Sequence, residues 1–115
     1  MKFSLARTSL LAASAAVFLF SSTVSAAVDE DAAKATAKRN DCFKCHAVDK
    51  TKKGPSYKKI AEKFKGKADA EEKVIKNITT GPKVKLEDGT EEEHKIIDTK
   101  DKAEIKNLID WILSR

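Results

Sequence analysis

The residues with the clearest chemistry lie in the stretch Cys42-Phe43-Lys44-Cys45-His46, which holds both cysteines of the chain and one of its two histidines. Two cysteines separated by two residues and followed directly by a histidine are the attachment signature of a c-type haem. Positions three apart on a helical turn share one face, so both sulfurs can reach the two vinyl groups at one porphyrin edge. His46 is then placed to bind the iron from the proximal side. The sequence predicts one covalently attached haem c, bound through Cys42, Cys45 and His46.

Three other roles explain this stretch less well. A thioredoxin-like dithiol needs a strand–helix–strand context, and nothing of that kind flanks Cys42. A structural zinc site needs four ligands, and the one available set, Cys42, Cys45, His46 and His94, lacks a second closely spaced pair. A disulfide between Cys42 and Cys45 would be strained and would close too short a loop to stabilise much.

The first 26 residues have the layout of a secretory signal peptide. Lys2 and Arg7 supply positive charge, residues 9–20 form an uncharged apolar run, and Val24-Ser25-Ala26 offers small residues for cleavage. Because the apolar run is short and no second one follows, we expect cleavage after Ala26 and export to the periplasm, with an uncleaved N-terminal anchor as the alternative. Residues 27–115 would then form one small domain.

Cleavage also changes the charge of the chain. Loss of Lys2 and Arg7 leaves 21 of the 23 basic residues against 18 acidic ones, so the formal net charge falls from +5 to +3. This balance gives little support to nucleic-acid binding. A domain of this size buries a limited core unless disulfides, a metal or a cofactor add to it. With both cysteines in the attachment motif, a buried haem is the group that would supply the missing apolar mass.

Two helices are expected to flank the motif. Residues 27–40 begin with acidic and end with basic side chains, which suits the helix dipole and predicts a helix of about ten residues leading into Cys42. Pro55 is expected to occupy the first position of a second helix, which ends at Gly66. The apolar positions of that helix form one stripe, Tyr57, Ile60, Ala61 and Phe64.

Two more helices are expected beyond Gly66. Asp69 and Glu72 have the spacing of a capping box, and the helix that they begin should stop before Gly81-Pro82. The last helix should be capped by Asp98 or Thr99 and run through Leu113. The inward positions of these two helices are Val74, Ile75, Ile78, Ile105, Leu108, Ile109, Trp111 and Ile112.

The segment between these two helices is the least regular, and a short hairpin around Asp88-Gly89 is possible there. The fold class is therefore all-α, with four helices and little or no sheet.

With these elements in place, the chain resembles the class I cytochromes c, the small single-haem bacterial kind. The resemblance covers the whole region 27–115. It rests on the attachment motif with Ala47, on Gly54-Pro55-Ser56-Tyr57, and on Trp111-Ile112-Leu113. It implies a fold of about four helices wrapped around one covalent haem.

The resemblance also implies two particular contacts. The first and last helices should cross near one haem edge, with Ala33 or Ala37 against Trp111. The backbone carbonyl of Pro55 should accept the ring N–H of His46 and fix the orientation of that ring.

The sixth position of the iron departs from the family pattern. Members normally bind it through a methionine on a loop before the last helix, whereas the only methionine here is Met1. His94 stands in that region, 48 positions beyond His46. We expect His94 to be the distal iron ligand. Two alternatives remain open: a solvated His94 with five-coordinate or water-bound iron, or ligation by Lys95 or another nearby group.

Ligation by His94 would affect the reduction potential. Imidazole donates more strongly than a thioether and favours ferric iron, so the potential should be low. The carboxylates of Glu91, Glu92 and Glu93 would act in the same direction if they lie near the haem. One of them could also accept the free ring N–H of His94.

These residues and the resemblance together predict a monomeric periplasmic carrier of single electrons, not an enzyme. The many lysines between residues 44 and 67 suggest redox partners with an acidic docking surface, although ordinary solvation explains them equally well. The alternative function follows from a free or labile His94, which would leave iron open to nitric oxide, carbon monoxide or peroxide.

Overall fold

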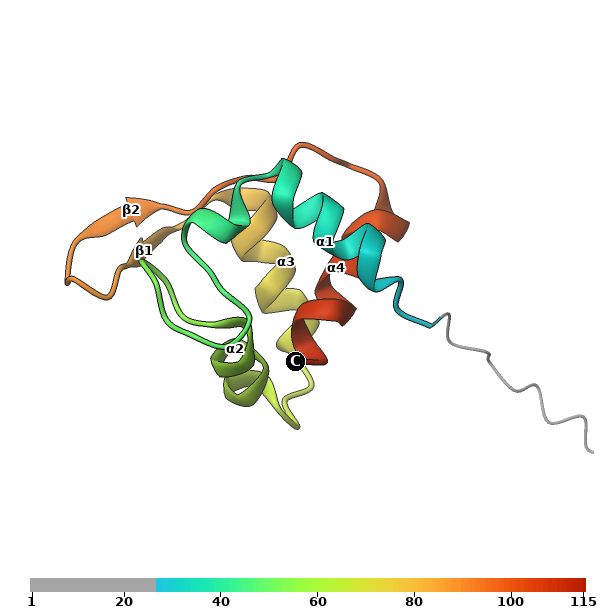
Figure 1. The fold of residues 1–115 in the computed structure, drawn as a ribbon, viewed down its shortest axis with the longest axis horizontal. Helices are drawn as coiled ribbons and strands as arrows, with labels where there is room; N and C mark the ends of the chain where they lie inside the picture. Colours follow the sequence, from blue (N-terminus) through green and yellow to red (C-terminus); the bar gives the residue numbers. More distant parts are fainter. Residues whose placement is uncertain (1–26) are drawn as a thin grey trace, which may run out of the picture.

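The computed structural model describes residues 27–115 as four α-helices, one 3₁₀ turn and a two-stranded hairpin (Figure 1). The elements in chain order are α1 (Glu30–Arg39), η1 (Cys42–Lys44), α2 (Tyr57–Phe64), α3 (Ala70–Thr80), β1 (Lys83–Lys85), β2 (Glu91–Glu93) and α4 (Lys102–Leu113). The predicted all-α class with little sheet is confirmed. The predicted signal peptide lies outside the described residues. Within residues 27–115, no helix is both long and apolar enough to span a bilayer.

Helices α1 and α4 pack against each other as the resemblance implied. Ala33 and Ala37 are fully buried in the same core cluster as Trp111. Because alanine side chains are short, the two helix axes can approach closely. At the other end of the contact, the side chain of Asn107 closes a pair of hydrogen bonds with the backbone of Asp29, each 2.8 Å long.

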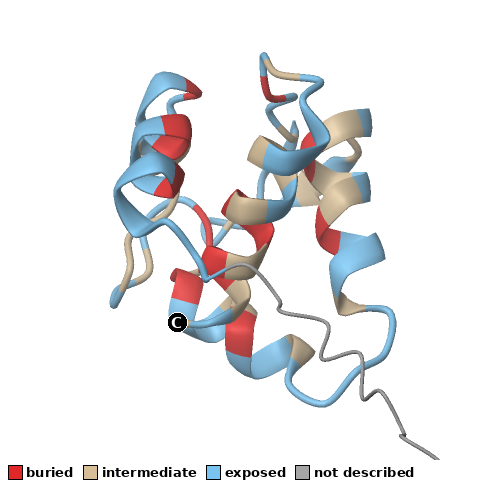
Figure 2. Cartoon of the chain, turned by 90° about the vertical axis from the view of Figure 1, so that its right-hand side faces the viewer, coloured by how far each residue is buried: buried red, intermediate tan, exposed pale blue. Residues whose placement is uncertain are grey.

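The apolar stripes of the remaining helices face the same core (Figure 2). Tyr57 and Ala61 of α2 are buried, as are Val74 and Ile78 of α3. The predicted first position of α2 is wrong, however. The helix begins at Tyr57, and the Ser56 hydroxyl accepts a hydrogen bond from the Lys59 backbone N–H, so Ser56 is the N-cap and Pro55 lies outside the helix.

Of the two other predicted caps, one has the right position. Asp69 is the N-cap residue of α3, but its side chain makes no capping hydrogen bond and instead pairs with Lys73 at 2.7 Å, so the predicted capping box does not form. Helix α4 is capped by Asp101, whose carboxylate accepts the Glu104 backbone N–H, rather than by Asp98 or Thr99. The carboxylate of Asp98 instead accepts hydrogen bonds from Arg39 and Asn40 at the end of α1.

The hairpin between α3 and α4 extends away from the helices (Figure 1). Lys83 pairs with Glu93 and Lys85 with Glu91, so lysines and glutamates face each other across the ribbon. The predicted turn at Asp88-Gly89 is present, because Asp88 accepts hydrogen bonds from both the N–H and the hydroxyl of Thr90. Val84 and Leu86 face back towards the helices and line a cavity.

Candidate haem site

The attachment motif forms a tight turn at the end of α1. Cys42 to Lys44 are a 3₁₀ helix, in which the Cys45 N–H donates to the Cys42 carbonyl at 3.2 Å and the His46 N–H donates to the same carbonyl at 2.9 Å. Residues three apart eclipse each other in such a turn, so the two cysteines project towards one side. Both cysteines are free, half-buried and line the same cavity. Burial raises the pKa of the Cys42 thiol.

His46 is held in one orientation by its neighbours. Its Nδ1–H donates to the Pro55 carbonyl over 2.6 Å, the contact that the resemblance implied. The ring of Tyr57 stacks on it with centres 5.3 Å apart and planes 28° apart. Burial lowers the pKa of His46 and outweighs the opposing effect of the Pro55 carbonyl, so the ring is neutral at pH 7. The Nε2 lone pair is therefore free to bind a metal.

His94 follows β2 directly, and its backbone is fixed to the loop after α3. Its N–H donates to the Pro82 carbonyl at 2.9 Å. Its ring Nδ1–H donates to the Lys95 carbonyl at 2.9 Å. The Lys95 carbonyl therefore takes the place that Glu91, Glu92 or Glu93 could have had as acceptor of this proton. Because Nδ1 carries the ring proton in this hydrogen bond, Nε2 of the neutral His94 ring has a free lone pair.

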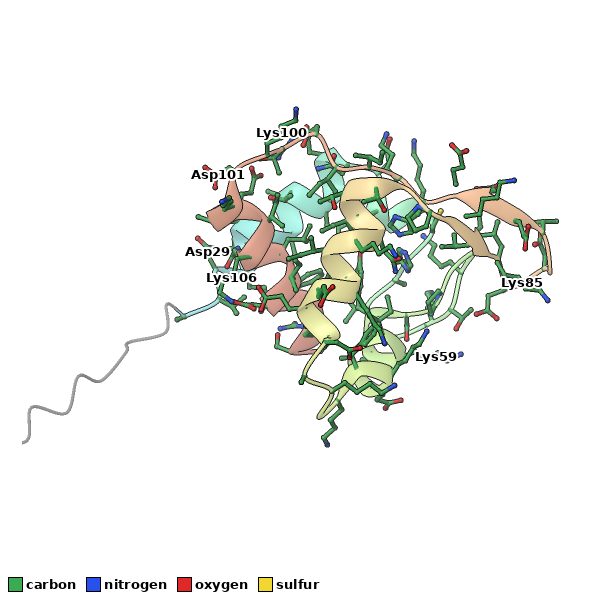
Figure 3. The ribbon with its side chains drawn as sticks, turned by 180° about the vertical axis from the view of Figure 1, so that it is seen from behind. Asp29, Lys59, Lys85, Lys100, Asp101 and Lys106 are labelled. Carbon is green, nitrogen blue, oxygen red and sulfur yellow. The ribbon has the colours of Figure 1, made fainter. Side chains whose placement is uncertain are left out.

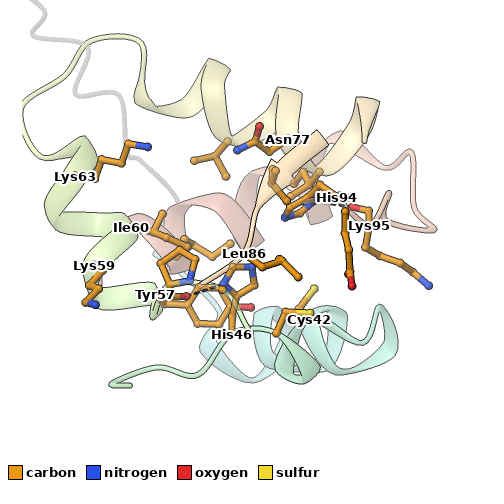
Figure 4. A pocket seen from close by; sticks show the side chains of 18 of the residues that line it. Cys42, His46, Tyr57, Lys59, Ile60, Lys63, Asn77, Leu86, His94 and Lys95 are labelled. Atoms are coloured by element: carbon orange, nitrogen blue, oxygen red, sulfur yellow. Dashed lines mark hydrogen bonds between the residues drawn. The ribbon is translucent and has the colours of Figure 1, made fainter. Parts of the chain in front are cut away.

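His46 and His94 lie on facing sides of the cavity (Figure 4), with ring centres 6.2 Å apart and planes 39° apart. Two metal–imidazole bonds of about 2 Å, with two ring radii of roughly 1.1 Å, would place trans imidazole centres about 6 Å apart. The spacing therefore fits one metal ion held between the two rings. Among the described residues, no three His, Cys, Asp or Glu side chains gather closely enough to hold a metal by themselves. A planar macrocycle would supply the remaining ligands.

The cavity itself fits a large apolar cofactor. Its volume is about 530 Å³, within the usual range for cofactor pockets. Apolar side chains from every helix except α1 form its walls, and charged ones stand at its rim. The wall residues are Ile60, Phe64, Val74, Ile78, Val84, Leu86, Leu108 and Ile112, and the rim residues include Lys59, Lys63, Lys85 and Lys95. The four residues singled out in the sequence all line this one space.

Two features of the site were not predicted. The Tyr57 ring stacks on His46, and its buried hydroxyl has a raised pKa because of that burial. The sequence places Tyr57 in the apolar stripe of α2 and in the stretch Gly54-Pro55-Ser56-Tyr57, but neither pattern predicts its contact with His46. The second feature is a side-chain bridge between Asn40 and Asp98. These residues are 58 positions apart, and no local pattern in the sequence connects them.

Comparisons with known proteins agree with this geometry. The family model described as Cytochrome c matches residues 30–115. The crystal structure of the class 1 cytochrome MtoD from Sideroxydans lithotrophicus ES-1 is 64% identical, with a TM-score of 0.73 over 76% of this chain and 97% of that chain. Wild-type cytochrome c552 of Nitrosomonas europaea is 31% identical, with a TM-score of 0.57 over 70% of this chain and 96% of that chain.

A shorter match comes from the curated proteins. Cytochrome c-551 of Pseudomonas aeruginosa is 43% identical over 44 residues, which are 38% of this chain and 42% of that protein. The alignment thus spans less than half of that relative. The chain belongs to the cytochrome c family, whose members are electron carriers with one covalently attached haem c rather than enzymes.

Proposed function

We propose that this protein is a periplasmic one-electron carrier whose haem iron is bound by His46 on one side and His94 on the other. The observation that carries the proposal is the pair of facing imidazoles, 6.2 Å apart across a cavity that Cys42 and Cys45 also line. The haem would supply the redox chemistry, an exchange of one electron between ferrous and ferric iron. The signal-peptide pattern of the first 26 residues supports the periplasmic location.

Cys42 and Cys45 would hold the haem covalently. Each thiol would add across one vinyl group of the haem and form a thioether, an addition that needs no oxidant or reductant. His46 follows Cys45 directly and would bind the iron of the attached haem. The bond from His46 to Pro55 then sets the tautomer and the ring orientation.

The ligand set favours a low reduction potential. Imidazole donates to iron more strongly than a thioether does, and Met1 is the only methionine in the chain. Glu92 and Glu93 line the cavity and would stabilise the ferric state further. For this reason, we expect a potential well below that of relatives with histidine and methionine ligands.

The rim of the cavity supports docking to acidic redox partners. Four lysines stand there on three different segments: Lys59 and Lys63 on α2, Lys85 on β1, and Lys95 after β2. Figure 3 shows the side chains of Lys59 and Lys85 at the surface. Positive charge around the edge through which an electron passes would attract an acidic surface and orient it before transfer.

The experiment that tests this function compares His94→Ala with Lys95→Ala in the purified holoprotein. Wild-type and Lys95→Ala proteins should show low-spin ferric spectra that resist added cyanide, together with equal potentials. His94→Ala should become high-spin, bind cyanide quickly and have a higher potential. If His94→Ala instead keeps the wild-type spectrum and potential, histidine ligation is wrong. Rapid cyanide and carbon monoxide binding by the wild type would favour a small-ligand-binding function.

A further inference from the structure

The attachment turn is tied directly to the segment that carries His94. Asn40, the C-cap of α1 and two residues before Cys42, is only 2% exposed. Its side-chain amide donates to the Asp98 carboxylate at 3.0 Å and to the Thr36 carbonyl at 2.9 Å. Its side-chain carbonyl accepts the Asp98 backbone N–H at 2.8 Å. Every hydrogen-bonding group of this buried amide side chain is therefore used, and the bridge runs in both directions.

The same carboxylate is fixed from a second side. The Arg39 guanidinium binds Asp98 through Nε at 2.8 Å and through Nη2 at 3.2 Å, and it also pairs with Glu104 on α4. Arg39 thereby lowers the pKa of Asp98, which stays ionised at neutral pH. The end of α1 thus holds Asp98 through the part-buried, uncharged amide of Asn40 and through the exposed, charged guanidinium of Arg39.

Residues 94–98 are held on their other side by α3 and the residues that follow it. The His94 N–H donates to the Pro82 carbonyl and the Ile97 N–H to the Ile78 carbonyl, both at 2.9 Å. Ile97 is buried in the core. His94 therefore lies on a short segment fixed at two places. These bonds and the bridge to Asn40 restrain the backbone that carries the His94 ring, so a backbone shift that moves His94 away from His46 must break at least one of them.

We propose that Asn40 and Asp98 are positioning residues that hold His94 at the haem iron. This inference rests on the proposed function, because it requires His94 to be the distal ligand. An external ligand can enter only when the His94 bond opens. A bridge that holds residues 94–98 against α1 lowers the fraction of molecules in the open state. Loss of the bridge leaves a buried amide unpaired and shifts the balance towards opening.

The test measures the rate of cyanide binding to the ferric holoprotein at neutral pH. Asp98→Ala and Asn40→Ala should each bind cyanide about tenfold faster than the wild type, the effect expected from losing a buried hydrogen bond. Asp98→Asn keeps a carbonyl oxygen that can accept from Asn40 and should restore most of the slow binding. Glu104→Gln is the matched control, because it removes the other acidic partner of Arg39 without touching residues 94–98.

The outcomes separate this inference from the proposed function. Equal acceleration in Asp98→Ala and Glu104→Gln would show a general loosening of α1 from α4 and would overturn the inference. Unchanged cyanide rates in Asp98→Ala and Asn40→Ala would overturn it as well, even where His94→Ala behaves as expected of a ligand variant. The Asn40→Ala/Asp98→Ala double variant should bind cyanide only slightly faster than either single variant. The two accelerations should not multiply, because both changes break the same bridge.

Discussion

Gly54 lies against the edge of the His46 imidazole. A Cβ atom at position 54 would be 2.9 Å from Cε1 and 3.3 Å from Nδ1 of that ring, closer than such atoms pack. The Gly54 N–H also donates to the Cys45 carbonyl at 2.8 Å, which holds the loop beneath the attachment turn. Position 54 requires glycine because the backbone lies so close to the His46 ring, and not because of an unusual backbone dihedral angle.

Substitution Gly54→Ala should therefore displace the His46 ring. The added methyl group has the Cys45 backbone and the His46 ring as neighbours, so we expect a loss of about 1–3 kcal/mol in the free energy of unfolding. The ring should also move relative to Pro55 and Tyr57, which changes the paramagnetically shifted NMR signals of the His46 ring. Denaturant unfolding and NMR of the holoprotein measure the two effects.

Gly66→Ala is the control for this change. Gly66 has a φ of 72°, which alanine adopts with strain, but an added Cβ would contact nothing within 4 Å. This variant should lose stability while the His46 signals stay in place. Equal NMR shifts in both variants would contradict a specific contact between Gly54 and His46.

The contact between α1 and α4 predicts a second effect. Ala37 is fully buried in the core cluster that contains Trp111, so the larger side chain of Ala37→Leu would force the two helices apart. We expect a cost of about 1–3 kcal/mol in the free energy of unfolding. Ala35→Leu places the same side chain on the exposed face of α1 and should leave stability within about 0.5 kcal/mol of the wild type. Urea denaturation of the two holoproteins checks the difference.

Local patterns in the sequence were sufficient to predict the helices and to single out Cys42, Cys45 and His46 at the cavity, whereas His94 was singled out through the family resemblance and the missing methionine. The stripe from Tyr57 to Phe64 needs only its own spacing, and the attachment motif carries its chemistry in five consecutive residues. The caps were harder to predict. Asp69 has the spacing of a capping residue, but its carboxylate pairs with Lys73, because the ammonium group competes for the same oxygens. Sequence spacing does not reveal which partner prevails.

The contacts of Asp98 and His94 could not be predicted for a different reason. The residues next to Asp98 in the sequence predict that it caps the last helix. Its partners are instead Asn40 and Arg39, which are 58 and 59 positions earlier in the chain. Such a bridge depends on how α1 and residues 94–98 meet in three dimensions. The nearby glutamates likewise offered possible acceptors for the His94 ring proton, whereas the carbonyl of the next residue takes it.

The lysines at the cavity rim predict how the protein exchanges electrons with charged reagents. The rate of oxidation of the ferrous protein by ferricyanide, an anion, should fall as ionic strength rises. At low salt, Lys63→Glu and Lys85→Glu should each slow this reaction by a factor of about two or more. Lys34→Glu is the control, because Lys34 lies on α1 and does not line the cavity. Equal slowing by all three substitutions, measured by stopped flow, would show an effect of net charge alone.

Glu104 predicts how the stability of the protein depends on acid. Its pKa falls from 4.5 to about 2, chiefly through hydrogen bonding to Arg39 and also through Thr99 and Thr36. A carboxylate whose pKa is lower in the folded than in the unfolded chain stabilises the folded state when the pH is above the unfolded pKa. This contribution is lost as the pH falls from about 4.5 towards 2. Glu104→Gln should therefore be less stable than the wild type at pH 7. The difference should shrink through that window and vanish near pH 2. Urea midpoints of the two holoproteins at pH 7, 4, 3 and 2 test this, and a constant difference across the series would mean that Glu104 acts through packing and not through its charge.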